Sequence, residues 1–262
     1  LVRFAKTYGD QGELLTRPGS LLEGRMTILH QLRRAALKLG LDVQRAQPFG
    51  PGRLLSRRGV DVVLDVGAHR GQYGEQLRSA GYRGRICSFE PLPASYELLA
   101  RRVSSDRAWE AHNLALGAED GTAILNVAGN EGASSSILPM LPRHVEAAPE
   151  AIYVDAIEVP IRRLDTIWDH IVPPARAPFL KLDVQGFEGV VLDGATDHLD
   201  GLIGLQLEIS VAAVYAGAPT LPEILKRTQA AGMRLVQVEP GFSDPATEEL
   251  LQMDGVFMRP AA

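Results

Sequence analysis

The chain has 262 residues, of which 45% are apolar. This suits one large domain with a buried core rather than two full domains. A net charge of −5 and a pI near 5.7 argue against a nucleic-acid-binding surface, which is usually basic. Because the chain has no run of 18 apolar residues and no signal-peptide core at its start, we expect no transmembrane segment and a cytoplasmic location.

Residues 1–58 are predicted to form an N-terminal helical extension. Apolar residues recur at helical spacing over 21–41, and Gly40 suits the end of that helix. The helix either packs on the domain or serves as a lid or dimer contact, so a homodimer is left open. The turn residues of 47–52 indicate a linker, and the main domain is expected over 59–262.

The main domain alternates apolar strand patterns with helical patterns, which favours a mostly parallel α/β sheet. The strands are predicted over 61–66, 85–90, 108–113, 122–128, 154–160, 178–183, 202–209, 233–239 and 252–258. The helices are predicted over 71–80, 93–103, 164–171, 186–194 and 220–231.

Two regions break this alternation. Strands without a long helix predict a β-rich insertion over about 117–160. The last two strands are joined by an irregular loop with Pro240, Gly241 and Pro245, which is unsuited to a crossover helix. We therefore expect those two strands to pair antiparallel.

The first βαβ unit carries the strongest functional signal. An apolar run that contains Asp65 leads into the loop Gly67-Ala68-His69-Arg70-Gly71, and Glu90 ends the next apolar run nineteen residues after Gly71. An acidic residue at the tip of the second strand typically meets a nucleotide ribose. A nucleoside-bearing cofactor is therefore expected.

The loop itself argues against a dinucleotide. The G-x-G-x-x-G pattern needs a second glycine so that backbone can approach a pyrophosphate, and His69 stands at that position. S-adenosylmethionine (SAM) has no phosphate and tolerates a bulkier loop, with Asp65 placed to serve its ammonium group. An NAD(P)-dependent oxidoreductase is the disfavoured alternative.

Six motifs in order resemble the FkbM family of SAM-dependent O-methyltransferases over about residues 60–260. They are Val-Leu-Asp-Val-Gly-Ala-His-Arg-Gly, Ser-Phe-Glu-Pro, Asn-Leu-Ala-Leu-Gly, a Ser-Ser-Ser loop, Lys-Leu-Asp-Val-Gln-Gly-Phe-Glu and Leu-Gln-Leu-Glu. The resemblance implies a Rossmann-like class I methyltransferase sheet, mostly parallel with an antiparallel last strand. It also implies an acceptor hydroxyl on a sugar, glycolipid, polysaccharide or polyketide.

The resemblance assigns cofactor-binding residues by position. It implies contacts from the first SAM motif, from the acidic ribose ligand and its neighbour, from the third strand's tip, from the serine loop and from the fourth parallel strand. These residues are Asp65, Gly67, Ala68, Gly71, Glu90, Pro91, Asn113, Leu114, Ala115, Ser135 and Asp183. Ser136 shares the serine loop. His69 stands where the family often has Asn, so no side-chain contact with the cofactor is assigned to it.

Asp183 and Glu208 are the leading catalytic candidates. Both end apolar runs, so both are expected at one edge of the sheet, where neighbouring strands lie ~4.8 Å apart. A sugar hydroxyl is a weak acid and needs a base or a metal ion. We hypothesise that the pair binds Mg²⁺ or Mn²⁺. Alternatively, Asp183 only orients SAM or substrate, and Glu208 pairs with an arginine.

His144 is the other candidate base, because histidine titrates near neutral pH and the insertion is expected to lie over the site. Its alternative is an ordinary surface position. Glu188 suits the start of a helix, where a carboxylate is favourable. The remaining histidines are read as structural or surface residues, and without paired H-x-x-x-H spacing zinc is not expected.

The sequence thus predicts a SAM-dependent O-methyltransferase whose acceptor is a sugar hydroxyl in an oligosaccharide, polysaccharide or glycolipid. The arginine- and alanine-rich composition fits an actinobacterial source. A polyketide or macrolide hydroxyl is the alternative acceptor. An NAD(P)-dependent oxidoreductase and a non-catalytic SAM-fold binding protein are the alternative classes.

Overall fold

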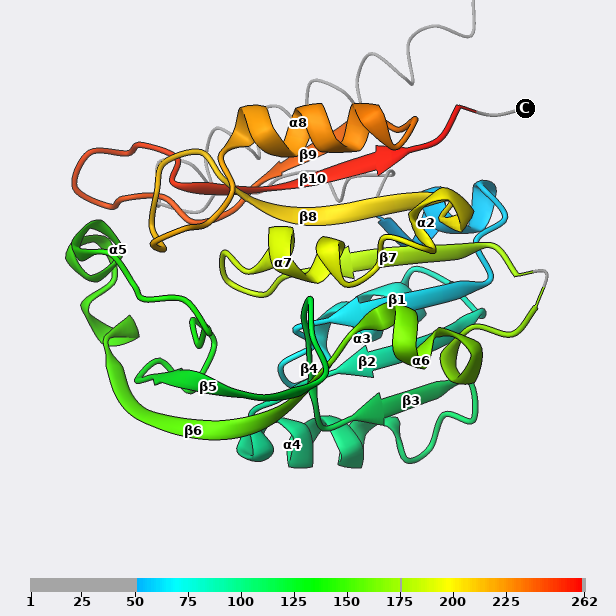
Figure 1. The fold of residues 1–262 in the computed structure, drawn as a ribbon, viewed down its shortest axis with the longest axis horizontal. Helices are drawn as coiled ribbons and strands as arrows, with labels where there is room; N and C mark the ends of the chain where they lie inside the picture. Colours follow the sequence, from blue (N-terminus) through cyan, green and yellow to red (C-terminus); the bar gives the residue numbers. More distant parts are fainter. Residues whose placement is uncertain (1–50, 175, 261–262) are drawn as a thin grey trace, which may run out of the picture. The chain divides into compact units, whose positions relative to one another are not determined.

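A computed structural model describes residues 51–174 and 176–260 (Figure 1). The helix predicted over 21–41, with His30, lies outside the described residues. The helices are α2 (Pro51–Arg57), α3 (Gln72–Ser79), α4 (Pro93–Val103), α5 (Pro142–Ala147), α6 (Leu164–Ile171), α7 (Glu188–Asp193) and α8 (Leu221–Ala230), with single turns η1 (Pro149–Ala151) and η2 (Leu199–Gly201).

Seven strands form the main sheet in the order β3-β2-β1-β7-β8-β10-β9. The five from β3 to β8 pair parallel, and β10 runs antiparallel to both of its neighbours, as predicted. They are β1 (Val62–Val66), β2 (Arg85–Phe89), β3 (Trp109–His112), β7 (Pro178–Leu182), β8 (Gly204–Ser210), β9 (Arg234–Pro240) and β10 (Gln252–Met258).

Each face of the main sheet is covered by helices, which explains why β1 and β7 are near-continuous apolar runs with every residue buried. One face packs on α2, α3 and α4 through Leu55, Leu77 and Leu99. The other packs on α6, α7 and α8, where Val191 and Ile224 contribute to the core. The α/β class predicted from the sequence is confirmed.

Three short elements escaped prediction. α2 begins inside the segment interpreted as a linker, because proline is accepted in the first turn of a helix. The two-residue strand β4 (Ala115–Leu116) and the six-residue helix α5 are too short to show a period.

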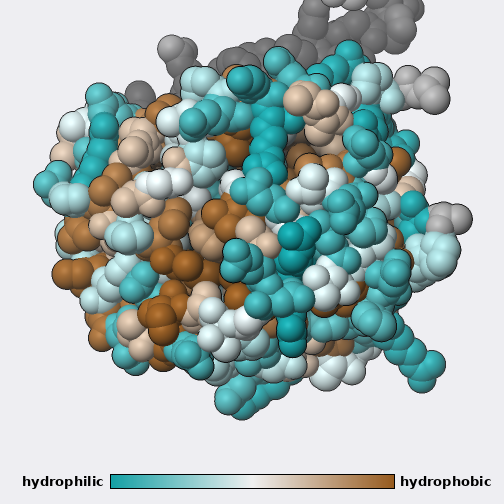
Figure 2. All heavy atoms as spheres, viewed as in Figure 1, coloured by the Kyte–Doolittle hydropathy of each residue, from teal (hydrophilic) through white to brown (hydrophobic). Residues whose placement is uncertain are grey.

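A second, three-stranded sheet lies beyond the carboxyl ends of the main parallel strands (Figure 1). Its order is β4-β6-β5, with β5 (Gly121–Ala128) and β6 (Tyr153–Arg162) antiparallel. Figure 2 shows apolar side chains gathered on the face over these strands. Ile124, Ile152 and Val154 are exposed by 54%, 53% and 66%. Ile124 lies on β5, Val154 on β6 and Ile152 immediately before β6, so this small sheet exposes large apolar side chains to solvent.

Within the described part of the chain, no helix has the length and apolar character needed to cross a bilayer.

We predict that Gly74→Ala destabilises the protein, although alanine is the better helix former by about 1 kcal/mol. Gly74 lies on α3, and an added Cβ would stand 2.2 Å from the Trp109 ring. Overpacking of this kind costs about 1–3 kcal/mol. Thermal unfolding measures the change, with Gly201→Ala as the control because that site is open. A higher melting temperature for Gly74→Ala would contradict this packing.

Candidate active site

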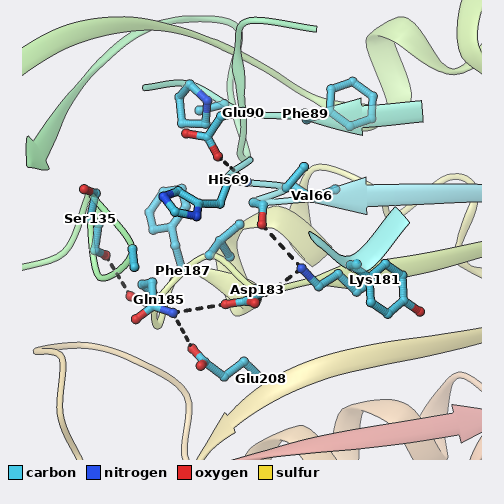
Figure 3. A pocket seen from close by; sticks show the side chains of 18 of the residues that line it. Val66, His69, Phe89, Glu90, Ser135, Lys181, Asp183, Gln185, Phe187 and Glu208 are labelled. Atoms are coloured by element: carbon cyan, nitrogen blue, oxygen red, sulfur yellow. Dashed lines mark hydrogen bonds and ion pairs between the residues drawn. The ribbon is translucent and has the colours of Figure 1, made fainter. Parts of the chain in front are cut away.

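A cavity of about 380 Å³ opens at the carboxyl edge of the main sheet (Figure 3). Loops after β1, β2 and β7 line it, together with Gln206 and Glu208 of strand β8 and residues of the insertion. Of the residues predicted from the sequence, the lining includes Gly67, Ala68, Glu90, Pro91, Leu114, Ala115, Ser135, Asp183 and Glu208. It also includes Ser136. Asp65, Gly71, Asn113 and His144 are not among the lining residues.

The loop after β1 packs directly against the end of β7. A Cβ on Gly67 would stand 1.8 Å from the carbonyl oxygen of Asp183, and the backbone has φ +74°. Both the space and the backbone conformation therefore require glycine. The N–H groups of Gly67 and Ala68 donate to the carbonyl of Phe89, at 3.0 Å each. These contacts join three strand ends at the cavity floor.

Glu90 ties the β1 loop to the loop after β2. Its Oε2 accepts from the His69 N–H at 2.7 Å, and its Oε1 accepts from the Leu92 N–H at 2.9 Å. Burial raises the pKa of Glu90 to about 7, while those two backbone donors oppose the rise. The Asn113 amide donates to the carbonyls of Glu90 and Pro91, at 2.8 and 3.1 Å. Asn113 thus supports the loop instead of facing the cavity.

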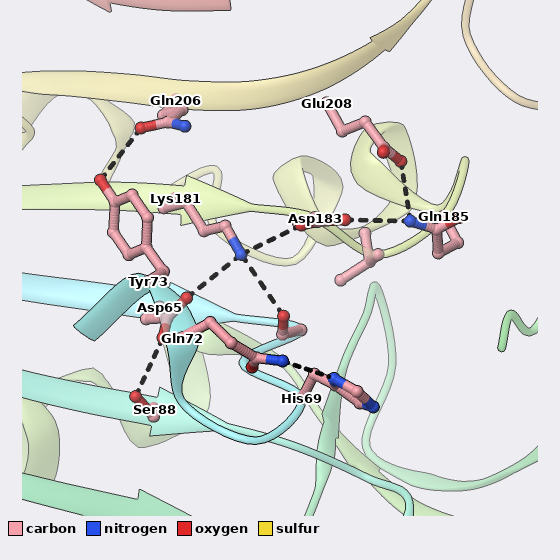
Figure 4. A network of polar contacts seen from close by, with 12 residues as sticks. Asp65, His69, Gln72, Tyr73, Ser88, Lys181, Asp183, Gln185, Gln206 and Glu208 are labelled. Atoms are coloured by element: carbon pink, nitrogen blue, oxygen red, sulfur yellow. Dashed lines mark hydrogen bonds and ion pairs between the residues drawn. The ribbon is translucent and has the colours of Figure 1, made fainter. Parts of the chain in front are cut away.

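Lys181 is a buried cation beside the cavity (Figure 4). Its Nζ lies 3.3 Å from Asp65 Oδ1 and 3.3 Å from Asp183 Oδ2, and it stands 5.3 Å from the centre of the Tyr73 ring. Burial alone would lower the pKa of Lys181, but Asp183 and Asp65 raise it above its usual range. Lys181 therefore acts as a fixed positive charge.

Asp65 differs from the expectation that it meets the cofactor's ammonium group. Its side chain is fully buried, pairs with Lys181 and accepts from Ser88 Oγ at 3.1 Å. Gly71 also packs inside, where an added Cβ would approach the Leu99 side chain at 2.9 Å. Both residues are buried beneath the loop after β1 and support it without lining the cavity.

Asp183 and Glu208 do lie at one edge of the cavity. The Nε2 of Gln185 donates to Asp183 Oδ1 and to Glu208 Oε2, at 3.0 Å each (Figure 3). Gln252 Nε2 also donates to Glu208 Oε2, at 2.8 Å. Burial first, and then Asp183, raise the pKa of Glu208 well above its ordinary value.

This arrangement does not fit the hypothesised Mg²⁺ or Mn²⁺ site. An amide donor stands between the two carboxylates, whereas a hard cation needs oxygen ligands there. Among the described residues, no group of three or more His, Cys, Asp or Glu is placed to hold a metal ion.

His144 lies away from the cavity, which corrects the expectation of a base there. α5 turns its ring into an apolar cluster, where the ring centre lies 5.1 Å from that of Tyr215 and 5.0 Å from that of Phe242. The side chain is 3% exposed, and burial lowers the pKa of His144. A ring enclosed in this way cannot take a proton from an acceptor in the cavity.

Hydrogen bonds of Ser135 and Ser136 hold the serine loop at the cavity. Ser135 Oγ accepts from the Ala128 N–H at 3.0 Å, and Ser136 Oγ donates to the Gln185 carbonyl at 2.7 Å. The insertion is thereby attached to the loop after β7.

Sequence reasoning missed several polar residues around the cavity. They are Tyr73, Lys181, Gln185, Gln206, Glu239 and Asp254, and His69 also lines the cavity. One of them had a readable signal: Lys181 is a lysine inside an otherwise apolar strand, and such a residue must find a partner.

An acidic second-strand tip, a loop too bulky for a pyrophosphate and an antiparallel β10 are together typical of class I SAM-dependent methyltransferases. The family model described as "Methyltransferase FkbM domain" matches residues 65–235. The chain belongs to this family.

Two curated relatives are similar to part of the chain. "Methyltransferase 1" of Beauveria bassiana is 24% identical over 173 residues, which cover 62% of this chain and 70% of the relative. "Methyltransferase sdnD" of Sordaria araneosa is 26% identical over 160 residues, which cover 52% and 61%. The chain thus spans under two thirds of the second relative.

Among solved structures, the FkbM methyltransferase of Methylobacillus flagellatus is 15% identical with a TM-score of 0.42. The match covers 75% of this chain and 44% of that one. The chain therefore spans less than half of that structure.

We predict that Lys181→Met destabilises the protein by about 3–5 kcal/mol, because it leaves the buried Asp65 carboxylate without its cation. The loss should persist throughout the neutral pH range, because, although burial alone would lower the pKa of Lys181, Asp183 and Asp65 raise it above its usual range and keep the side chain charged there. Denaturant unfolding measured across pH checks this prediction, and Lys226→Met, at an exposed position of α8, serves as the control. An equal, small loss in both variants would contradict the role of Lys181.

We predict that the affinity for S-adenosylhomocysteine (SAH) falls as pH drops below about 7, because ribose hydroxyls donate best to ionised Glu90. Glu90→Gln should weaken binding about 10-fold or more and reduce this pH dependence. Calorimetry measures both effects, with Glu97→Gln on exposed α4 as control. Unchanged affinity in Glu90→Gln would argue against a ribose contact.

Proposed function

We propose that the protein transfers a methyl group from SAM to a sugar hydroxyl of an oligosaccharide, polysaccharide or glycolipid. The observation that carries the proposal is the layout of the cavity. Glu90 lies on one side of it and the Asp183–Glu208 pair lies on the other (Figure 3). A cytoplasmic location and a homodimer belong to the same proposal.

The residues of the cavity fit SAM. Gly67 leaves backbone space that a Cβ would fill, and Glu90 offers carboxylate oxygens that can each accept a further hydrogen bond. Bound SAM would supply the methyl group on a positively charged sulfur. Carboxylates around the cavity favour a cationic group.

Methyl transfer to a hydroxyl requires an in-line approach of the oxygen to within about 3 Å and the removal of its proton. In the proposal, Asp183 and Glu208 perform the second task. Burial and Asp183 raise the pKa of Glu208, which makes its carboxylate a stronger proton acceptor than an ordinary glutamate. Lys181 Nζ lies 3.3 Å from Asp183 Oδ2 and holds that carboxylate in place. No step in the proposal uses a metal ion.

The apolar residues Leu114, Leu125 and Phe187 in the cavity lining support an acceptor that combines a hydroxyl with an apolar portion. On β5, Leu125 faces the cavity, while the neighbouring Ile124 is exposed on the opposite face of the strand. A glycolipid has this character. A polyketide or macrolide hydroxyl shares it and is the second candidate acceptor.

Turnover with SAM and an acceptor panel tests the proposal. We expect methyl transfer to a saccharide or glycolipid, unaffected by EDTA, and a thermal shift with SAH but not with NADH. Glu208→Gln should lower kcat about 10²–10⁴-fold and keep the SAH shift, while Glu119→Gln, at an exposed loop, should match the wild type.

Each alternative has its own outcome. A shift with NADH alone would favour an oxidoreductase. Binding of SAH without turnover on any acceptor would favour a non-catalytic binding protein. Turnover that is lost with EDTA and restored by Mg²⁺ would support a Mg²⁺ site at Asp183 and Glu208.

A further inference from the structure

Gln185 joins the two carboxylates of the site through one amide group (Figures 3 and 4). We propose that Gln185 is a positioning residue: its amide takes the place of a cation between Asp183 and Glu208 and holds the pair aligned. The link between this alignment and proton removal rests on the proposed function.

The amide has a fixed direction. Its Oε1 accepts from the Tyr215 hydroxyl at 2.6 Å, while its Nε2 faces both acids at 3.0 Å. A tyrosine hydroxyl can donate or accept, but an ionised carboxylate can only accept. The carboxylates therefore select the N–H end of the amide, and Tyr215 satisfies the oxygen end.

The backbone at Gln185 is also held. Its φ is +56°, in the left-handed region that non-glycine residues rarely adopt. The Ser136 hydroxyl donates to its carbonyl at 2.7 Å, and Tyr215, which holds the side chain, is 1% exposed. A strained conformation persists only where the surroundings fix it. The surroundings here are the insertion and the segment after β8.

The Gln185 amide offsets the electrostatic repulsion between the two carboxylates. Like charges at close range disfavour each other's ionised forms, and N–H donors offset that cost. The charged groups facing the pair are Lys181 on β7, Glu188 on α7 and Asp254 on β10. Lys181 lies beside Asp183 Oδ2, so the amide is the shared donor that reaches both Asp183 and Glu208.

Two substitutions separate positioning from packing. Gln185→Met keeps the volume and removes both N–H donors. Gln185→Glu replaces the amide with a third carboxylate, and three converging carboxylates form the kind of site that binds a divalent cation.

The first test is thermal unfolding of Gln185→Met against pH. Without the N–H donors, the pKa of Glu208, which burial already raises, rises further in the folded protein. The loss of melting temperature should therefore be small near pH 5 and grow toward about pH 8, as Glu208 ionises. A loss that is independent of pH would show a packing role and overturn the proposal.

The second test is Mn²⁺ binding followed by electron paramagnetic resonance. We expect wild type and the exposed control Gln229→Glu to leave the Mn²⁺ signal unchanged, and Gln185→Glu to bind one Mn²⁺ while still binding SAH. Equal Mn²⁺ binding by wild type and Gln185→Glu, or none by a Gln185→Glu protein that binds SAH, would overturn the proposal. If Gln185→Glu does not fold, the Gln185→Met experiment decides alone.

Neither test needs an acceptor, so the proposal and the function can fail separately. No methyl transfer by the wild type, together with the expected pH and Mn²⁺ results, would remove the function and keep the amide's role. Where an acceptor is found, Gln185→Met should lower kcat with little change in the KM for SAM. Unchanged kcat would overturn the link to proton removal.

Discussion

The site depends on one buried ion-pair cluster. Lys181 and Asp65 are direct partners in the parallel pairing of β1 with β7, and Lys181 also reaches Asp183 at the end of its own strand. Removing either partner would leave a buried charge uncompensated, which is far more costly than leaving both out. The cluster thereby fixes the ends of β1 and β7, where Gly67 packs against the Asp183 backbone and begins the cavity floor.

Several acidic side chains lie in or next to the cavity, and their burial shifts their pKa values. Burial raises the pKa of Glu188 to about 7 and of Asp254 to about 6, and Asp183 adds to both rises. A cluster poised in this way can take up a proton near neutral pH and favours a cationic group. Amide groups of Gln185 and Gln252 donate hydrogen bonds to Asp183 and Glu208 in the same cluster. Burial of these acids costs folding free energy, and the same burial raises their pKa values and suits the carboxyls to proton transfer.

The fold and half of the site were readable from the sequence because both depend on strand ends. Apolar runs located the strands, and the acidic residues at or near their ends, Glu90, Asp183 and Glu208, line the cavity at the carboxyl edge. Asp65 was misjudged because its role depends on a partner from β7 that the local pattern does not reveal. His144 was misjudged because six-residue α5 has no readable face. Gln185 was missed because its importance comes from contacts made by β8 and by the segment after it.

A structure of the protein with SAH bound tests the central claim most directly. The account predicts ribose hydroxyls within hydrogen-bond distance of Glu90, and the sulfur on the side of the cavity that holds Asp183 and Glu208. It would be contradicted if SAH bound outside this cavity, or if Glu90 and the carboxylate pair did not face the same molecule.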